Sequence, residues 1–295
     1  MRLTPPRTVH IVVYPGCKAI EVIGALTVFD HANQQRQALG HPPAYDLRLV
    51  APQAGEVMAD SLISFSATTL PDPACADTAL VIGARDIHQA LAQQPALIDW
   101  CRHVAARRQR LIGVCSGAFF LAEAGVLKGL EVTTHWRLAD RLAQDYPALR
   151  VNADAIFIQQ QHLWTCAGVS AVLDLSLALV EQDLGQALAL AIARELVIYL
   201  KRPGGQAQFS QHLGSQMAQH AGIGALQGWI LQHLEQPLGL EHLAARMNMS
   251  SRNLRRLFQR EAQCSPSAFV ERARLERAQR LLVQGTMPLK RVASH

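Results

Sequence analysis

The segment that decides the organisation of this chain is LGLEHLAARMNMSSRNLRRLFQRE, residues 238–261. Its first half predicts a short helix with one apolar face, formed by Leu240, Leu243, Ala244 and Met247. Asn248 tolerates the left-handed backbone conformation that a tight corner needs, and Ser250 is a good N-cap for a following helix. The segment is therefore predicted to fold as two short helices joined by a corner.

The second predicted helix has one apolar side and one cationic side. At about 100° per residue, the apolar side is formed by Leu254, Leu257 and Phe258. The opposite side is formed by Arg252, Arg255, Arg256 and Gln259. Arginine reads guanine edges and holds phosphates in a major groove, so the pattern is typical of a recognition helix. The alternative is an amphipathic helix whose arginine-rich face is only solvated. If this helix were the only evidence, that alternative would be more common than DNA binding.

The segments that follow favour the first interpretation. Ser265 and Pro266 are a suitable cap and first residue for a third helix, which continues to Leu282. The motifs LAARMNMSSRNLRRLF, ERARLERAQRLL and PLKRVASH come in the order and spacing of the AraC/XylS family of transcription regulators, which this part of the chain resembles. In that family two helix-turn-helix units, joined by a long helix, read successive major grooves. The resemblance places Arg252, Asn253 and Arg256 at DNA, and the predicted contact set also includes Ser251, Arg255 and Gln259.

Two positions depart from the family pattern. Gln263 stands where the family has a glycine that ends the recognition helix. The sequence stops at His295, inside the first helix of the second unit, so that unit is predicted to be truncated and the helix from Pro288 to fray. Whether the chain is a fragment or naturally short, one complete DNA-reading unit is expected.

Length and charge divide the chain into two domains. The 295 residues suit two domains, and the whole excess of positive charge lies at one end. From residue 206 onward there are 11 Lys and Arg against 5 Asp and Glu, whereas residues 1–205 have 17 against 18. A basic C-terminal part is expected if only that part approaches a polyanion. The predicted domains are residues 1–201 and 223–295, joined by a linker at 202–222.

Several classes of protein are disfavoured. No apolar run is long enough to span a membrane and the first ten residues do not form a secretory signal, so a cytoplasmic protein is expected. The six cysteines have no paired CxxC spacing, so neither a metal site nor a disulfide framework is predicted. The chain lacks GxGxxG and GxxxxGK[ST], and no cofactor is expected.

Strands and helices alternate in the N-terminal part, which predicts a parallel sheet covered by helices on both faces. Strands are predicted at residues 9–14, 45–51, 61–66, 79–82, 111–114, 155–158 and 163–165. Helices are predicted in the stretch after Gly16 that holds Glu21 and at residues 95–110, 116–124, 137–146, 169–183 and 184–200. Sheets of this type bind ligands at the carboxyl ends of their strands.

One of those strand ends carries a candidate nucleophile. Gly113-Val114-Cys115-Ser116-Gly117 has the pattern of a nucleophile elbow, in which a strand turns sharply into a helix and flanking glycines leave room for the turn. At the start of that helix the dipole favours a thiolate at Cys115. The alternative is a buried cysteine that only packs, but the two glycines favour the elbow.

With this motif the first 205 residues resemble the PfpI/ThiJ-like branch of the class I glutamine amidotransferase-like fold, in its version fused to AraC-type domains (GlxA type). The resemblance rests on AIEVIGALTVF, GVCSGAFFLAEAGVLKGLEVTTHW, TCAGVSAVLDLSLALV and GGQAQF. It implies a flavodoxin-like parallel sheet sandwiched by helices, with a small all-α helix-turn-helix domain after it. It also implies a pocket formed by Cys115, the acidic Glu21, Ser116 and His135.

The catalytic set is incomplete. Ser116 stands where peptidase-like relatives have a histidine, and packing beside Trp136 is at least as good an explanation of His135 as catalysis. Gly83-Ala84 replaces the glycine pair that offers amides to an oxyanion. The pocket is therefore predicted to be a ligand site and not an active site. Two alternatives stay open: a cysteine-dependent hydratase or amidase of the isonitrile hydratase type with a vestigial DNA-binding tail, and a redox sensor at Cys115.

These observations together predict a transcription regulator. Its expected partners are double-stranded DNA, a small-molecule effector and a second copy of the chain, because the α/β domain is expected to sense a ligand or to dimerise. The resemblance implies small nitrogen-containing metabolites as effectors. Enzymatic activity is not expected.

Overall fold

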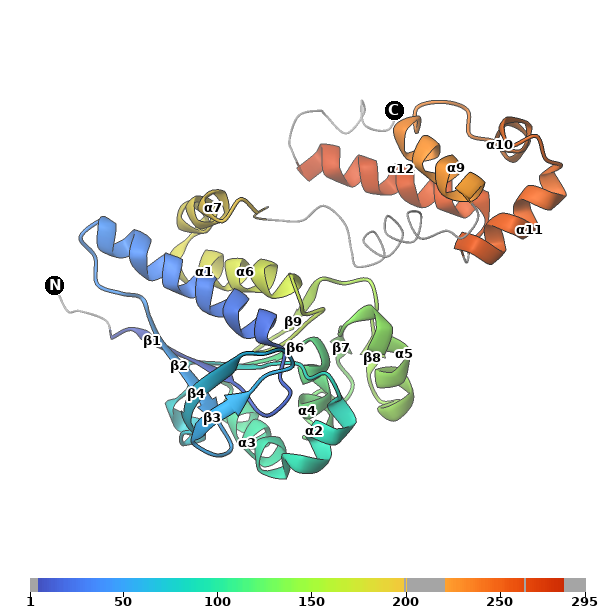
Figure 1. The fold of residues 1–295 in the computed structure, drawn as a ribbon. Coiled ribbons are helices and arrows are strands. Elements are labelled where there is room, and N and C mark those ends of the chain that lie inside the picture. Colours follow the sequence, from blue (N-terminus) through green and yellow to red (C-terminus); the bar gives the residue numbers. More distant parts are fainter. Residues whose placement is uncertain (1–4, 199, 201–220, 263, 284–295) are drawn as a thin grey trace. The chain divides into compact units, whose positions relative to one another are not determined.

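The computed structural model describes residues 5–198, 200, 221–262 and 264–283 (Figure 1). The chain forms two compact units, Met1–Arg202 and Pro203–His295, and each is described by itself below. We call them the sheet unit and the helical unit. The linker predicted at 202–222 lies outside the described residues except for its last two.

The sheet unit contains a mixed, mostly parallel sheet of eight strands in the order β3-β4-β2-β1-β5-β6-β10-β9. All neighbouring pairs are parallel except β3 with β4 at one edge and β9 with β10 at the other, which are antiparallel. The strands are β1 Arg7–Val12, β2 Tyr45–Ala51, β3 Gly55–Met58, β4 Ser64–Thr69, β5 Thr78–Val81, β6 Arg110–Val114, β9 Phe157–Gln160 and β10 Leu163–Cys166. The two short strands β7 (Glu131–Val132) and β8 (Arg150–Val151) pair separately.

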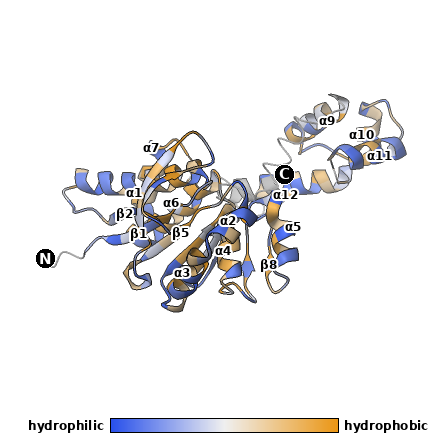
Figure 2. Cartoon of the chain, turned by 60° about the horizontal axis from the view of Figure 1, so that its bottom comes forward, coloured by the Kyte–Doolittle hydropathy of each residue, from blue (hydrophilic) through white to orange (hydrophobic). Residues whose placement is uncertain are grey.

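Helices cover both faces of this sheet, as Figure 1 shows. Helices α1 (Ala19–Ala38), α6 (Ala171–Leu184) and α7 (Gln186–Glu195) lie on one face. Helices α2 (Ile87–Gln93), α3 (Pro95–Ala106) and α4 (Ala118–Glu123) lie on the other, and α5 (Trp136–Asp145) follows β7. The central strands are buried on both sides; all four residues of β5 are buried, which explains their continuous apolar run. The hydropathy colouring in Figure 2 shows this apolar interior between the helices.

The predicted parallel sheet is confirmed, with differences at its edges. Strand β2 has the predicted bounds, and the other predicted strands shift by one to three residues. Strands β3, β7 and β8 and helix α2 are not among the predicted elements, since each is short: four, two, two and seven residues. The helix predicted to reach residue 110 ends at Ala106, because Arg108 adopts a left-handed φ of 57° that a helix cannot contain. The helix predicted at 184–200 ends at Glu195.

The helical unit contains α9 (Ala221–Gln232), α10 (Leu240–Arg246), α11 (Ser251–Ala262) and α12 (Pro266–Val283). The predicted helix-turn-helix is confirmed as α10 and α11. Asn248 has the expected left-handed φ of 52°, and the Ser250 hydroxyl accepts a hydrogen bond from the Asn253 amide at 3.3 Å. At the start of α12 the Ser265 hydroxyl accepts one from the Ala268 amide at 3.2 Å. Gln263 and the truncated second unit predicted beyond residue 283 lie outside the described residues.

The part of the chain that the structure describes contains no helix long and apolar enough to cross a bilayer. Within the same residues, no three His, Cys, Asp or Glu side chains are grouped so that they could hold a metal ion.

Candidate functional site

Cys115 occupies a strained turn at the carboxyl end of β6. Its φ is 54°, a conformation that non-glycine residues rarely adopt, and the chain passes from β6 through a single 3-10 turn, Cys115–Gly117, into α4. A Cβ at Gly117 would lie 2.1 Å from the Val81 carbonyl oxygen, and one at Gly113 would lie 2.7 Å from the Ala118 Cα. Both glycines are therefore required for the turn, and the predicted elbow is present.

Glu21 reaches the elbow from α1 and is completely buried. Its Oε1 accepts a hydrogen bond from the Val169 amide, and its Oε2 accepts one from the Gly83 amide, each at 2.9 Å. The Cys115 side chain lies beside this carboxyl group, because a Cβ at Gly168 would meet both of them. Gly168 closes the site: its φ is 79°, and a Cβ there would lie 2.1 Å from the Cys115 Cβ. The predicted pairing of Cys115 with Glu21 is thus seen in the structure.

The thiolate predicted for Cys115 is wrong. Burial raises the pKa of the Cys115 thiol well above its ordinary value, and the Glu21 carboxyl raises it further, outweighing the Ser116 amide and Lys18, which lower it. Burial also raises the pKa of Glu21, against the hydrogen bonds that the Val169 and Gly83 amides donate to it. With 2% of its surface exposed, Cys115 is a protected thiol. The helix dipole does not compensate, because α4 has only six residues and the thiol is almost completely buried.

The amides that an oxyanion would need are occupied by the protein itself. The Gly83 amide donates to Glu21, and the Ala84 amide donates to the Ser116 hydroxyl at 2.8 Å. Ser116 is fully buried, and its hydroxyl lies 3.2 Å from the Ala84 carbonyl, to which it donates. The structure therefore uses Ser116 to fasten the loop after β5 to the elbow, and this part of an oxyanion site is filled.

His135 lies at the start of α5, where its Nδ1 lies 3.4 Å from the Arg137 amide and caps the helix. Its ring packs against Trp136 at 5.6 Å between centroids. Burial lowers the pKa of His135, and the charges of Lys18 and Arg137 lower it further, so the ring is neutral at pH 7. Within the described residues it makes no hydrogen bond to the thiol, and it is not placed as a base for Cys115.

Four residues of this site were not among the predicted ones. Thr134 precedes His135 and is buried, and its hydroxyl donates a hydrogen bond to the Cys115 carbonyl at 2.7 Å. Gly168 and Val169 supply the space and one amide at Glu21, and Lys18 contributes the nearest positive charge. The available signal was positional: Gly168 and Val169 follow β10, the parallel neighbour of β6, so their loop must lie beside the elbow.

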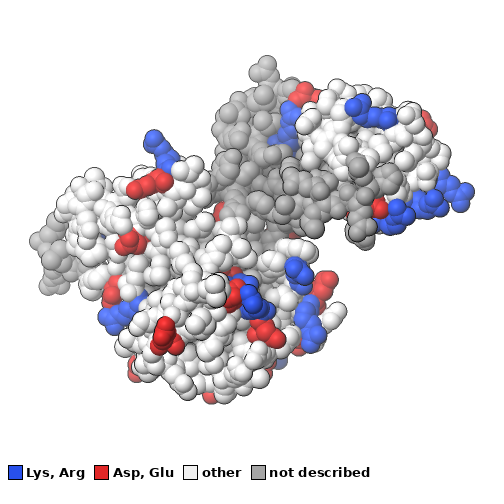
Figure 3. Space-filling model, viewed as in Figure 1, with Lys and Arg blue, Asp and Glu red and all other residues white. Residues whose placement is uncertain are grey.

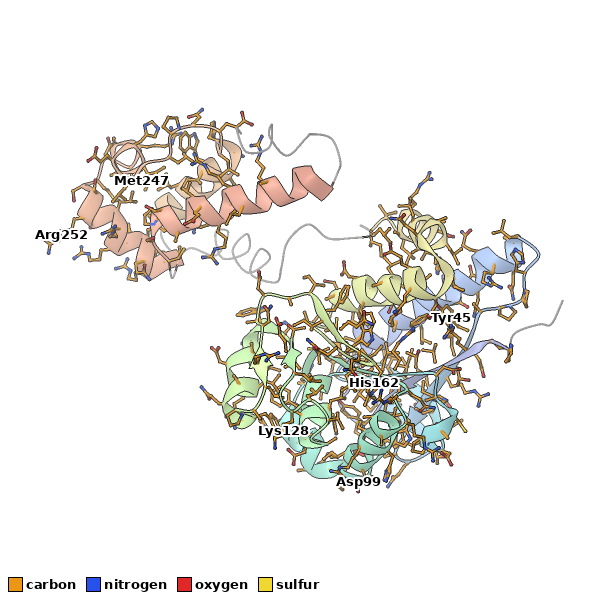
Figure 4. The ribbon with its side chains drawn as sticks, turned by 180° about the vertical axis from the view of Figure 1, so that it is seen from behind. Tyr45, Asp99, Lys128, His162, Met247 and Arg252 are labelled. Atoms are coloured by element: carbon orange, nitrogen blue, oxygen red, sulfur yellow. The ribbon has the colours of Figure 1, made fainter. Side chains whose placement is uncertain are left out.

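The second candidate site is the outer face of α11, where the predicted amphipathic pattern is confirmed. Leu254 and Phe258 are completely buried, and all the predicted contact residues on α11 are exposed except Ser251, which is half-buried. Figure 3 shows basic side chains at the edge of the helical unit, and Figure 4 shows Arg252 pointing away from its helix. Arg256 donates to the Asn253 side chain at 3.2 Å, which holds both on one face.

A shallow hollow of about 680 Å³ adjoins this face. It is lined by four arginines, one glutamine and a serine: Arg252, Arg255, Arg256, Arg260, Gln259 and Ser265. Arg260 and Ser265 were not predicted to belong to the face. The four guanidinium groups give this surface a concentrated positive charge, which suits a polyanion.

Comparison with known proteins identifies both domains. A model of the DJ-1/PfpI family matches residues 7–182, and a model of a helix-turn-helix domain matches residues 243–295. The chain belongs to the DJ-1/PfpI family. With its helix-turn-helix domain, it is an AraC-type DNA-binding transcription regulator.

Two relatives that match most of the chain are transcriptional regulators. The transcriptional regulator CdhR of Pseudomonas aeruginosa is 28% identical over 95% of this chain and 81% of its own length. The regulator GlxA of Rhizobium meliloti is 26% identical over 85% of this chain and 77% of its own. A crystal structure of an AraC family transcriptional regulator from Pseudomonas putida covers 65% of this chain and all of its own, with a TM-score of 0.58 at 24% identity, which shows the same fold.

One enzyme also matches. Isonitrile hydratase of Pseudomonas putida is 29% identical over 40% of this chain and 50% of its own length. Several relatives that extend over most of this DJ-1/PfpI chain are regulators, whereas the similarity to the hydratase is confined to less than half of it.

Proposed function

We propose that this regulator reads its operator with the outer face of α11, through Ser251, Arg252, Asn253, Arg255, Arg256 and Gln259. The observation that carries the proposal is the division of one helix into a buried side, with Leu254 and Phe258 at 0% exposure, and an exposed cationic side. Because α10 and α12 hold the apolar side, the arginines are free to enter a major groove.

A fluorescence titration of labelled promoter duplex at several salt concentrations tests this proposal. Each phosphate that the protein neutralises should lower the logarithm of the binding constant by about 0.9 per unit of log salt. A salt-independent affinity would contradict the proposed interface.

Single substitutions test whether DNA binding depends on particular side chains of the α11 face or only on the net charge of the protein. Arg252→Ala or Arg256→Ala should weaken specific binding by about 1 to 3 kcal/mol if the side chain contacts a base, whereas a phosphate contact should reduce the salt slope by about one. Arg107→Ala is the matched control, because Arg107 is an exposed arginine at the end of α3 in the sheet unit. Equal effects of all three substitutions would show that only net charge matters.

We further propose that the sheet unit senses a ligand and does not catalyse a reaction. The support is chemical: the Cys115 thiol stays protonated, the Gly83 and Ala84 amides are occupied, and His135 caps a helix. A nucleophilic thiol needs a lowered pKa or an available base. Here the pKa of the thiol is raised, and the neighbouring carboxyl of Glu21 is buried with both oxygens bonded to backbone amides. An effector that binds this unit would then alter DNA binding by differential affinity for two states.

The alternative of a cysteine-dependent hydratase is favoured by one observation, the position of the Glu21 carboxyl beside the Cys115 thiol. Incubation with nitriles, isonitriles, amides and dicarbonyls decides between the two. Turnover that Cys115→Ala abolishes would establish an enzyme and overturn the sensor proposal, whereas no turnover with any of these substrates is the expected result.

Thiol labelling tests the protected state of Cys115, and with it the redox alternative. Cys75 is exposed and should react with iodoacetamide or mild peroxide, while Cys115 at 2% exposure should remain unmodified in the folded protein. Mass spectrometry of the digested protein measures both sites in one sample. Faster modification of Cys115 than of Cys75 would favour a redox sensor.

We also propose a homodimer, which doubles the number of reading units on DNA. Apolar side chains are exposed at the start of α1, Ile20 at 55% and Ile23 at 45%, and on the turn between β3 and β4, where Leu62 is fully exposed. Asp60 holds this turn beside α1 by accepting a hydrogen bond from the Ala19 amide at 3.1 Å. Light scattering should show a dimer that Ile20→Asp weakens and Val197→Asp, at another exposed apolar site, does not.

A further inference from the structure

A second hollow, of about 340 Å³, lies in the sheet unit at the end of the sheet opposite to Cys115. Its wall includes Arg110, the first residue of β6, and residues just before and within β10, which is parallel to β6. Cys115 follows the other end of β6, so the two places are separated by the length of that strand, roughly 17 Å at 3.3 Å per residue. The volume is within the range of sites for small molecules.

The wall of this hollow is held rigidly. Asp183, almost completely buried, accepts hydrogen bonds from both terminal nitrogens of Arg110, at 2.8 and 3.0 Å, and one from the Tyr45 hydroxyl at 3.1 Å. His162 makes a hydrogen bond from Nε2 to the Ala105 carbonyl at 3.1 Å and is labelled in Figure 4. The side-chain amide of Gln109 donates to the Ala74 carbonyl at 2.9 Å. Such a site is formed before a ligand arrives.

Two turns at the rim have strained backbone. Arg108 and Gln161, which both line the hollow, adopt left-handed φ values of 57° and 58°. The same conformation occurs at Cys115 and Val169, around Glu21. Strain in non-glycine residues costs on the order of 1 kcal/mol or more and is concentrated at functional sites. Here Arg108 and Gln161, from two separate loops, line one cavity.

The chemistry of the wall is polar and carries both signs of charge. Four side-chain amides line it, those of Gln109, Gln159, Gln161 and Gln182. The nitrogens of Gln109 and Gln159 donate to backbone carbonyls and the oxygen of Gln182 accepts from Arg110, so each of these three keeps its other group for a ligand. Arg108 is exposed and forms no ion pair with the residues that the structure describes. Asp77 accepts the Thr8 amide at Oδ2, at 2.8 Å, and its other oxygen can accept a further donor.

We propose that this hollow is the effector site and that it binds a free amino acid. Arg108 holds the carboxylate, Asp77 holds the ammonium group, and the glutamine amides hydrogen-bond to polar atoms of the side chain. The Oε1 of Gln109, buried and without a partner among the described residues, adds an acceptor to this wall. A phosphate ester fits less well, because Arg110 is committed to Asp183 and Asp77 repels a dianion. The proposal deepens the sensing role given above and rests on it.

Calorimetric titration of the intact protein with each of the twenty free amino acids tests this site. At least one should bind, and Arg108→Ala and Gln161→Ala should each weaken that binding at least tenfold. Arg107→Ala is the matched control, since it removes the neighbouring exposed arginine, which does not line the hollow. Cys115→Ala should leave the affinity unchanged.

Three outcomes would overturn the proposal: no binding of any amino acid, equal loss in Arg107→Ala, or loss in Cys115→Ala with Arg108→Ala unaffected. The promoter titration is performed on the same variants without amino acid, where Arg108→Ala should behave as the unaltered chain. Failure of the amino-acid site with intact DNA binding is thus distinguishable from failure of the DNA-binding function.

Discussion

The two candidate sites, at Cys115 and on α11, use polar groups in opposite ways. In the sheet unit, Glu21, Ser116 and Thr134 are buried and bonded to the backbone of neighbouring loops. In the helical unit, the core is apolar apart from Gln227 among the described residues, and the cations of α11 are exposed. Polar groups that already have partners stabilise a fold, whereas exposed and uncommitted ones are available to a ligand. This difference supports the proposals that α11 binds DNA and that the buried polar groups around Cys115 stabilise the fold.

The largest change in the free energy of unfolding is expected when a glycine is replaced by alanine, and its sign should differ between the two units. Gly168→Ala should lower the free energy of unfolding of the sheet unit by about 3 to 5 kcal/mol, because the new Cβ meets the Cys115 Cβ and the residue has a left-handed φ. Gly228→Ala, in α9, meets no atom within 4 Å and should stabilise its helix by up to about 1 kcal/mol. Calorimetric unfolding of the intact chain measures both. If Gly168→Ala left the free energy of unfolding unchanged, the elbow would have to be loosely packed.

DNA binding should respond to the helical unit alone. Arg256→Ala is expected to weaken promoter binding by about 1 to 3 kcal/mol, because it removes a guanidinium group and also the hydrogen bond that orients Asn253. Glu21→Gln should leave the affinity of the ligand-free protein unchanged. If Glu21→Gln weakened DNA binding as much as Arg256→Ala, the separation of roles between the two units would be wrong.

The free energy of unfolding should depend on pH because Glu21 is buried. Its pKa is raised in the folded state, so the folded protein binds a proton more tightly than the unfolded chain. The contribution of Glu21 to stability is therefore fully present below its ordinary pKa of 4.5 and is lost as the pH rises through the folded pKa. One such group changes the free energy of unfolding by at most about 1.4 kcal/mol per pH unit.

Glutamine at position 21 imitates the protonated acid and does not titrate. The stability advantage of Glu21 over Glu21→Gln should therefore decline as the pH rises above 4.5 in urea-unfolding experiments at several pH values. An advantage that grew with pH would indicate that hydrogen bonds from Val169 and Gly83 outweigh burial and keep the carboxylate ionised.

The smallest effect should arise at the corner of the helix-turn-helix. Ser250→Ala removes the hydroxyl that accepts the Asn253 amide and should destabilise the helical unit by about 1 kcal/mol. Ser265→Ala removes the equivalent cap of α12 and should have a similar effect. Thermal unfolding followed by circular dichroism would measure both. A loss above 2 kcal/mol at Ser250 would show that the corner also depends on tertiary contacts of this side chain.

Local patterns were sufficient for the helix-turn-helix and for the central strands. The amphipathic period of α11 and the caps at Ser250 and Ser265 depend on neighbours within one turn, which the sequence displays directly. The elbow at Cys115 was predictable for the same reason, because Gly113 and Gly117 lie two positions before and after it.

The protonation state of Cys115 and the contacts of Glu21 depend on residues far apart in the chain. Val169 is 148 positions from Glu21, and Gly83 is 62 positions from it. A motif gives the identity of the thiol but not the desolvation around it, which outweighs the helix dipole. The strained turns at Arg108 and Gln161 were also not predictable, since neither residue favours a left-handed conformation.

The two antiparallel edges of the sheet have a consequence for the behaviour of the protein at high concentration. Strands β3 and β9, which end the sheet on either side, have four residues each. So short an edge presents few unpaired amide and carbonyl groups, and an approaching chain can add only a brief and weak ladder to it. Molecules that meet edge to edge should therefore separate again, and growth of the sheet into fibrils is disfavoured by the way the sheet ends.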